Sequence, residues 1–283
     1  QLGYTGEKAV ARIGRQAVSW GNGLIYNPVD FFNPFDPAAV DKEYKTGDDM
    51  FYGQYLQDSG NDWQFVSVWR RDEDGNTDSD VNSNALKYHA FVGERELDVL
   101  LARHFEDQIA SLGGVSNWGG AILRGDVMVT HTDLDTYTSL VANLSYSWTW
   151  GGKNVSGVAE YFFNGLGLRE NDYDELGESY DLVVRIARGE LFTIGRHYLA
   201  GGLTLELNPL LNLTPTAFLN LGDASGLVQL AGSYDISQSW QLLFAVNLPF
   251  GDDGTEFGGL ESGVDSLNLS FGPSLFTQLA FYF

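Results

Sequence analysis

The chain ends in a stretch that decides its fold, Ser274-Leu275-Phe276-Thr277-Gln278-Leu279-Ala280-Phe281-Tyr282-Phe283. Successive side chains of a β-strand point to opposite faces. One face of this segment therefore carries Leu275, Thr277, Leu279, Phe281 and Phe283, and the other carries Phe276, Gln278, Ala280 and Tyr282. The pattern predicts an amphipathic strand. Taken alone, it fits the last strand of either a soluble protein or a membrane barrel.

The same alternation recurs along the chain. Apolar residues occupy every second position, and Ser, Thr, Asn, Gln and Glu stand between them, in residues 140–150, 199–208, 211–221, 228–234 and 240–248. A tilted strand of about 9–11 residues can cross a bilayer, whereas strands of soluble sheets are typically about 5–6 residues long. A soluble β-sandwich also alternates. Strand length, aromatic residues at the ends of the apolar faces, and polar opposite faces favour a transmembrane barrel with a wet interior.

The composition excludes several classes of function. The chain has 283 residues, a formal net charge of −22 and no cysteine. Such acidity argues against a nucleic-acid partner, because phosphate binding needs a basic surface. The lack of cysteine excludes disulfides and zinc–thiolate sites. With 43% hydrophobic residues, the chain is not predicted to be disordered. No run approaches the ~20 apolar residues of a membrane helix, so strands are the predicted membrane-spanning elements.

The lengths of the connections favour an up-and-down barrel, in which periplasmic turns are short and extracellular loops are longer. With the C-terminus in the periplasm, the longer connections lie outside, at residues 71–83, 163–196, 222–226 and 249–273. The short ones lie inside, at residues 58–61, 151–154, 208–210 and 236–239. We therefore predict one all-β, antiparallel outer-membrane barrel over residues 1–283, with about 14 strands and a long extracellular loop at residues 164–195.

The first residues also belong to a predicted strand. Gln1-Leu2-Gly3-Tyr4 is the expected tail of a descending strand, followed by a turn at Thr5-Gly6-Glu7 and a new strand near Lys8. One interpretation is that N-terminal strands are missing from this chain, which would give roughly 16 strands in the complete barrel. The alternative is a mature N-terminus with a short periplasmic tail.

Residues 21–49 are predicted to form a loop that folds back into the lumen. Residues 27–37 hold three prolines among several Phe and Asn residues, and the apolar side chains need burial. Such a loop could constrict the lumen, or it could form a packed extracellular cap with no gating role. The residues assigned to the constriction are Arg15, Trp20, Asp30, Phe31, Phe32, Phe35 and Asp36. Arg15 could equally anchor the end of the strand.

The same region carries a family resemblance. Gly14-Arg15-Gln16, running into Ser19-Trp20-Gly21 and the loop Asn27-Pro28-Val29-Asp30, resembles poorly characterised porin-like and alginate-export-like outer-membrane barrels of Gram-negative bacteria. Residues 188–199 fit the same group. The closing strand resembles the signal that the barrel assembly machinery reads, which implies this role for Phe281 and Phe283. The resemblance also implies contact with outer-membrane lipid and lipopolysaccharide, but it identifies no substrate.

The predicted function is a porin-like channel or export conduit with a polar lumen constricted by the inserted loop. The residues expected to line that lumen are Arg124, Asp126, Ser145, Glu160, Glu206, Asn220, Gln229, Gln241 and Gln278. The alternative is a non-conducting barrel that anchors or sheathes a partner in an envelope complex. Enzymatic activity is not predicted, because the four histidines show neither metal-ligand spacing nor a readable Ser/His/Asp grouping.

One acidic turn is a candidate calcium site. Oxygen-bearing side chains stand at every second position around Gly75, at Asp72, Asp74, Asn76, Asp78 and Asp80. Ca²⁺ takes 6–8 oxygen ligands, and this spacing loosely resembles calcium-binding loops. The closing Glu of an EF-hand is absent. A solvated acidic loop near lipopolysaccharide-bound divalent ions is the alternative, and no other cofactor is predicted.

Overall fold

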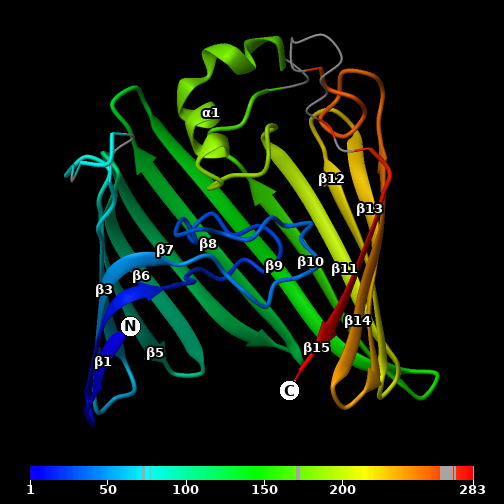
Figure 1. Ribbon diagram of the computed structural model, residues 1–283, viewed down its shortest axis with the longest axis horizontal. Coiled ribbons are helices and arrows are strands. Elements are labelled where there is room, and N and C mark those ends of the chain that lie inside the picture. Colours follow the sequence, from blue (N-terminus) through cyan, green and yellow to red (C-terminus); the bar gives the residue numbers. More distant parts are fainter. Residues whose placement is uncertain (72–73, 77, 170–172, 262–269, 271, 283) are drawn as a thin grey trace.

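The structure is a computed structural model of the chain and describes residues 1–71, 74–76, 78–169, 173–261, 270 and 272–282. In this part of the chain, fifteen strands form one antiparallel sheet (Figure 1). They are β1 (Leu2–Thr5), β2 (Ala9–Gln16), β3 (Asp48–Leu56), β4 (Asp62–Val68), β5 (Ser83–Val92), β6 (Arg95–His104), β7 (Asp107–Trp118), β8 (Ala121–His131), β9 (Thr136–Trp150), β10 (Lys153–Phe163), β11 (His197–Asn208), β12 (Leu211–Asn220), β13 (Ser225–Ser237), β14 (Trp240–Phe250) and β15 (Ser274–Phe281).

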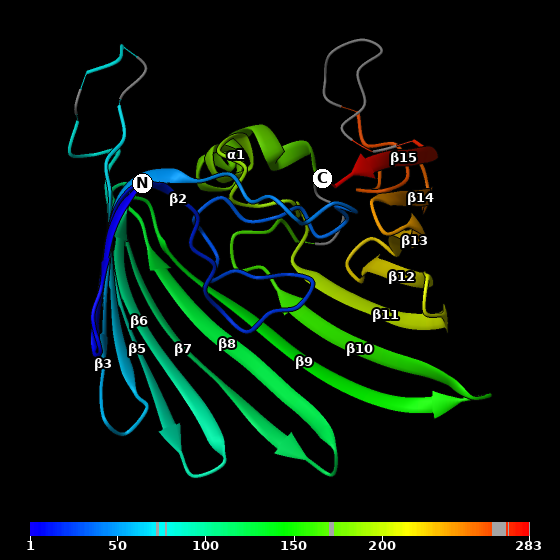
Figure 2. The ribbon, with the colours of Figure 1, turned by 60° about the horizontal axis from the view of Figure 1, so that its bottom comes forward.

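Each strand pairs with the next along the chain, from β1 to β15. The all-β, up-and-down fold is therefore confirmed, with fifteen strands where about 14 were expected. The stretch between residues 94 and 118 forms two strands, β6 and β7, joined by a tight turn at residues 105–106. The sheet curves as a barrel wall does but is not closed, and β1 and β15 are its two edges in the described residues (Figure 2).

The connections segregate by length. Those at one end of the sheet are short, at residues 6–8, 57–61, 93–94, 119–120, 151–152, 209–210 and 238–239. The opposite end carries the long ones, at residues 17–47, 69–82, 164–196 and 251–273, with shorter turns between them. The helical elements η1 (Tyr173–Glu178) and α1 (Tyr180–Ala187) lie in one of these long connections, above the barrel interior in Figure 1. In the described residues no helix has the length and apolar character needed to span a membrane.

The outer face of the sheet is apolar. On β8, Val127 and Val129 are exposed, whereas Asp126, Met128 and Thr130 between and beside them are buried on the inner face. An exposed row of aromatic residues follows the short-turn end of the outer face: Trp63, Trp118, Trp150, Trp240 and Phe281. An apolar surface bordered by aromatic side chains suits the hydrocarbon core of a bilayer and its interface.

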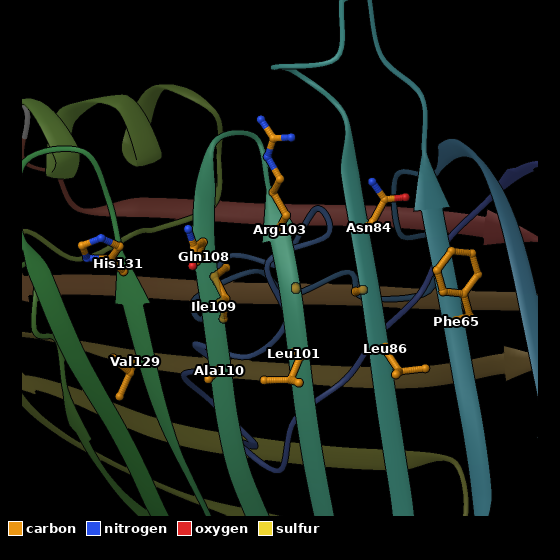
Figure 3. A pocket seen from close by; sticks show the side chains of 12 residues that line it. Phe65, Asn84, Leu86, Leu101, Arg103, Gln108, Ile109, Ala110, Val129 and His131 are labelled. Carbon is orange, nitrogen blue, oxygen red and sulfur yellow. The ribbon is translucent and has the colours of Figure 1, made fainter.

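Figure 3 shows the same outer face near the long-loop end, over β4 to β8. Leu86, Leu101 and Val129 project from the strands around the small Ala110. Together they leave a shallow groove of about 540 Å³. A polar row lies beyond the apolar side chains, toward the strand ends: Asn84, Arg103, Gln108 and His131. This change from apolar to polar side chains marks the second border of the apolar belt.

Candidate functional site: the inserted loop and the inner face of the barrel

The connection between β2 and β3, residues 17–47, lies within the curve of the sheet (Figures 1 and 2). We call it the inserted loop. The sequence placed its boundaries at residues 21–49, but residues 48 and 49 belong to β3. Arg15 lies in β2 rather than in the loop and forms an exposed ion pair with Asp49, with Nη2 and Oδ2 3.0 Å apart. Arg15 thus lies outside the loop that would form the constriction, and both of its predicted roles, in the constriction or as an anchor of the strand end, stay predictions.

The first part of the inserted loop is bound by β8. The buried carboxylate of Asp126 accepts hydrogen bonds from the backbone N–H of Asn22 at 2.5 Å and from its side-chain amide at 2.7 Å. Gly113 stands opposite Asp126 on β7, where an added Cβ would lie 1.8 Å from the carboxylate oxygen. Gly21 has φ of +91°, a conformation that favours glycine. Two glycines therefore allow the close approach of the loop to Asp126.

The next three residues of the loop bind one carboxylate of β10. Glu160 accepts hydrogen bonds from the backbone N–H groups of Leu24 at 2.6 Å, Ile25 at 3.0 Å and Tyr26 at 2.5 Å. Asn143 of β9 donates to the same carboxylate at 3.1 Å and to the carbonyl of Asn22 at 2.9 Å. Successive backbone N–H groups around an anion form a strong, directional site. In this barrel the anion belongs to the wall and the N–H groups belong to the loop.

A buried ion pair closes the middle of the loop on itself. Lys45 Nζ lies 2.5 Å from Asp30 Oδ1 and also donates to the carbonyl of Val18 at 2.6 Å. Burial raises the pKa of Asp30 to about 6 even though Lys45 acts in the opposite direction, and burial lowers the pKa of Lys45. The loop therefore keeps its shape through a charged pair that solvent barely reaches.

The aromatic residues of the loop pack against β3 to β8. Trp20, Phe31 and Phe32 are buried in an apolar cluster with side chains of the inner face, including Met50 and Val66. Trp20 also donates its indole N–H to Gln64 of β4 at 2.8 Å. Phe35 is only partly buried, and Asp36 caps a turn by accepting from the backbone N–H of Ala38 at 2.8 Å.

The second half of the loop reaches the other side of the sheet. Gln229 of β13 donates to the carbonyl of Ala38 at 2.7 Å, and Gln278 of β15 donates to Asp41 at 2.9 Å. Tyr282 donates to Glu43 at 3.0 Å. The inserted loop therefore contacts side chains of the wall from β3 to β15.

The connection at residues 164–196 covers the inserted loop from above. Arg185 of α1 binds Asp107 of β7, and Thr132 donates to Asp181 at 2.8 Å. The connection at residues 251–261 joins it through Glu256, whose carboxylate accepts from the backbone N–H of Ile194 at 2.8 Å. Three segments that are distant in sequence thus meet over the barrel interior.

Three side chains of the types Ser, His and Glu form a hydrogen-bonded series beneath the connection at residues 164–196. His104 Nδ1 is 2.9 Å from Ser83 Oγ, and His104 Nε2 is 3.0 Å from Glu190 Oε1. These are the residue types of a hydrolase triad. Ser83 has no exposed surface, and its oxygen accepts a hydrogen bond from Arg70 at 2.6 Å. These contacts therefore tie Glu190, in the connection around α1, to the ends of β5 and β6.

The nine residues expected to line the lumen make polar contacts. Asp126, Glu160, Gln229 and Gln278 bind the inserted loop. Asn220 binds Glu256 at 2.7 Å. The remaining contacts join neighbouring side chains, Arg124 to Ser145 at 2.8 Å, Glu206 to Asn154 at 2.7 Å, and Gln241 to Asp235 at 2.9 Å. Their role in lining a conducting lumen stays a prediction.

The acidic turn and the closing strand remain partly outside the structure. Asp72 and Phe283 lie outside the described residues. Among the residues that the structure describes, no group of three or more acidic or histidine side chains could hold a metal ion. Asp80 instead pairs with Arg103, with their charged atoms 3.5 Å apart. Calcium binding by Asp72, Asp74, Asn76, Asp78 and Asp80 stays a prediction. The assembly role of Phe281 and Phe283 also stays a prediction; Phe281 packs on Trp240.

Sequence reasoning missed several of the residues that organise this site. Tyr198, Asn143, Asp98 and Glu256 are buried or half-buried and bind loop segments or other inner-face groups. Asn143 and Tyr198 could have been found, because both stand on the polar or buried side of an alternating strand. Glu256 could not, because its connection shows no periodicity that indicates which side chains point inward.

The antiparallel meander, the apolar outer face with its aromatic row and the polar inner face define an outer-membrane β-barrel of the Gram-negative type. No protein-family model and no curated protein matches the chain. Two solved barrels are similar in structure. Wzi of Escherichia coli, an outer-membrane protein involved in group 1 capsule assembly and described as a carbohydrate-binding β-barrel, matches with a TM-score of 0.59 and 11% identity, over 89% of this chain. The chain spans only 66% of the length of Wzi.

The second similar structure is OccK10 (OpdN) of Pseudomonas aeruginosa. It matches with a TM-score of 0.54 and 10% identity, over 98% of this chain and 80% of its own length. At such low identity both similarities show the fold alone. They support the predicted resemblance to outer-membrane barrels and place the chain in that structural class.

Proposed function

We propose that this protein is a porin-like outer-membrane channel or export conduit in which the inserted loop constricts a polar lumen. The observation that carries the proposal is the docking of residues 22–26 on Asp126 and Glu160, two carboxylates that project inward from neighbouring parts of the wall. A loop held by the wall at several points would narrow the passage through the barrel. The similarity to OccK10 supports the outer-membrane barrel fold on which this proposal rests.

The inner face on the short-turn side of the loop is hydrophilic, as a solute path requires. A hollow of about 380 Å³ lies there between β9 and β12. Its polar lining consists of Ser147, Thr149, Asn154, Ser156, Thr204, Glu206 and Asn212. We place this end and the C-terminus in the periplasm, because short turns face the periplasm in bacterial barrels.

Single-channel conductance in a planar bilayer tests the proposal. The full chain should give a small current, and replacing residues 19–45 by a short Gly/Ser linker should raise it severalfold. Asp58→Asn, in an exposed short turn where Asp58 pairs with Lys8, is the matched control and should leave the current unchanged. An absence of current both with and without the loop would refute the channel.

The second candidate is a non-conducting barrel that anchors or sheathes a partner. The specific observation in its favour is the extent of apolar packing behind the loop, where Trp20, Phe31 and Phe32 join one cluster and Tyr26 joins another. Wzi, a barrel of capsule assembly, shows that a related fold serves an envelope pathway. Recovery of a stoichiometric envelope partner after cross-linking in cells, together with zero conductance, would favour this candidate over the channel.

A further inference from the structure

A cavity of about 360 Å³ lies where the inserted loop, the connection around α1 and the connection after β14 meet. We call it the cap cavity. The inserted loop contributes Tyr26, Asp36, Pro37 and Ala38, and the connection around α1 contributes Leu176, Val183, Ile186, Leu191, Phe192, Thr193 and Ile194. The wall and the last connection contribute Phe218, Leu227, Glu256 and Phe257. Its volume falls within the range of about 300–1,000 Å³ that is usual for small-molecule sites.

The lining of the cap cavity is largely apolar, and it includes two carboxyl groups. Ile186, Leu227 and Phe257 represent the apolar majority, which removes water from an occupant. The carboxyl groups belong to Asp36 and Glu256. Among the described lining residues there is no lysine or arginine. Lys42, which does not line the cavity, interacts electrostatically with Asp36, and its Nζ donates to the carbonyl of Pro37 at 3.3 Å.

The carboxylate of Glu256 is fixed in place by the fold. Its Oε2 accepts hydrogen bonds from the hydroxyl of Tyr198 at 2.6 Å and from the amide of Asn220 at 2.7 Å, and its Oε1 accepts from Ile194 at 2.8 Å. Burial raises the pKa of this carboxyl to about 7. A buried acid without a cationic partner is costly to ionise, so a positive charge placed beside it would be strongly favoured.

We propose that the cap cavity binds a small, largely apolar amine, with its ring or alkyl body among Ile186, Leu227 and Phe257 and its ammonium group facing Asp36 and Glu256. Charge complementarity selects this occupant. A carboxylate of the same shape would meet two acids and no lining base, and a neutral alcohol would gain only hydrogen bonds. This binding site goes beyond the proposed channel, because an occupant could bind whether or not the barrel conducts.

Three probes with one ring system test the charge preference: 1-naphthylmethylamine, 1-naphthalenemethanol and 1-naphthoate. Their binding to the full chain in a neutral amphiphilic polymer is followed by calorimetry. We expect saturable binding of the amine at one site, at least tenfold weaker binding of the alcohol and no measurable binding of naphthoate. Similar affinities for all three probes would overturn the proposal, because partition into apolar surface alone would explain them.

Matched variants locate the site. Ala38→Phe fills the cap cavity and should abolish amine binding, whereas Ala39→Phe introduces the same side chain at a neighbour that does not line the cavity and should leave it unchanged. Asp36→Asn keeps the oxygen that accepts from Ala38 and should weaken amine binding at least fivefold without affecting the alcohol. Glu256→Gln should act in the same way. Amine binding that persists in Ala38→Phe, or that is unchanged in Asp36→Asn and in Glu256→Gln, would refute the assignment. The conductance of the same samples reports on the channel separately.

Discussion

Substituting Glu160 by Gln should release the inserted loop from the wall. Glu160 is 1% exposed, and its two oxygens share four donors. The backbone N–H groups of Ile25 and Tyr26 donate to Oε1, and Leu24 and Asn143 donate to Oε2. An amide keeps one oxygen and replaces the other by NH₂. The two N–H donors that bind the replaced oxygen would then face the NH₂ group, which is itself a donor.

The expected magnitude follows from the bonds that are lost. Hydrogen bonds to a charged group contribute about 1.5–3 kcal/mol each, so two of them contribute about 3–6 kcal/mol. Gln avoids the cost of burying a charge, which offsets part of this loss. We expect docking of residues 22–26 to weaken by about 2–4 kcal/mol, which corresponds to roughly 30-fold to 1,000-fold in the ratio of released to docked loop.

Amide hydrogen exchange measures this ratio directly at the backbone groups concerned. Residues 24–26 should exchange faster in Glu160→Gln by the stated factor, while the strand amides of β10 remain protected. Glu206→Gln is the control, because Glu206 faces the same interior from β11 but binds Asn154 rather than the loop. Exchange at residues 24–26 within threefold of the wild type in Glu160→Gln would show that Glu160 does not hold the loop.

Three further substitutions test other parts of the site. Lys45→Met leaves Asp30 buried without its partner and should destabilise the barrel by about 3–5 kcal/mol, a loss that Asp30→Asn in the same chain should largely restore when thermal unfolding is compared. Because the pKa of Glu256 is raised to about 7 from about 4.3 in an unfolded chain, its stabilising effect is complete below pH ~4.3 and declines up to pH ~7. The melting temperature of the wild type should therefore fall over this interval relative to that of Glu256→Gln, and parallel curves would contradict the effect. Arg15→Ala removes only an exposed ion pair with Asp49 and should change neither the melting temperature nor the conductance. A marked rise in conductance would instead indicate that Arg15 contributes to the constriction.

The fold could be predicted because its signal is local. Alternation with period two assigns each side chain to a face without any knowledge of its partner, so the polar residues of β8 to β15 could be separated from the apolar ones. The lengths of the connections then assign each connection to one end of the barrel. Where a turn is very short this signal is lost, as at residues 105–106, which separate β6 from β7 with only two residues.

The partners of the inner-face residues could not be predicted from the same signal. Asp126 and Asn22 are 104 residues apart, and Glu160 and Leu24 are 136 apart. Alternation gives the face of Asp126 but neither its depth in the barrel nor the segment that reaches it. Gly113 is a usable local sign, because a glycine in mid-strand often marks the close approach of another group. For the connections at residues 164–196 and 251–261, the sequence offers no comparable sign.

The way in which the inserted loop is bound follows from the acidity of the chain. With 38 acidic and 16 basic side chains, cations cannot pair with every inward carboxylate. Asp126, Glu160 and Glu256 accept instead from backbone N–H groups, amides and a hydroxyl. Backbone donors are present in every residue except proline, so the docking of residues 24–26 depends on the path of the loop more than on its side chains. The docking therefore depends mainly on the identity of the wall carboxylates. For this reason, the polar residues on the inner faces of the strands predicted this site better than the composition of the loop did.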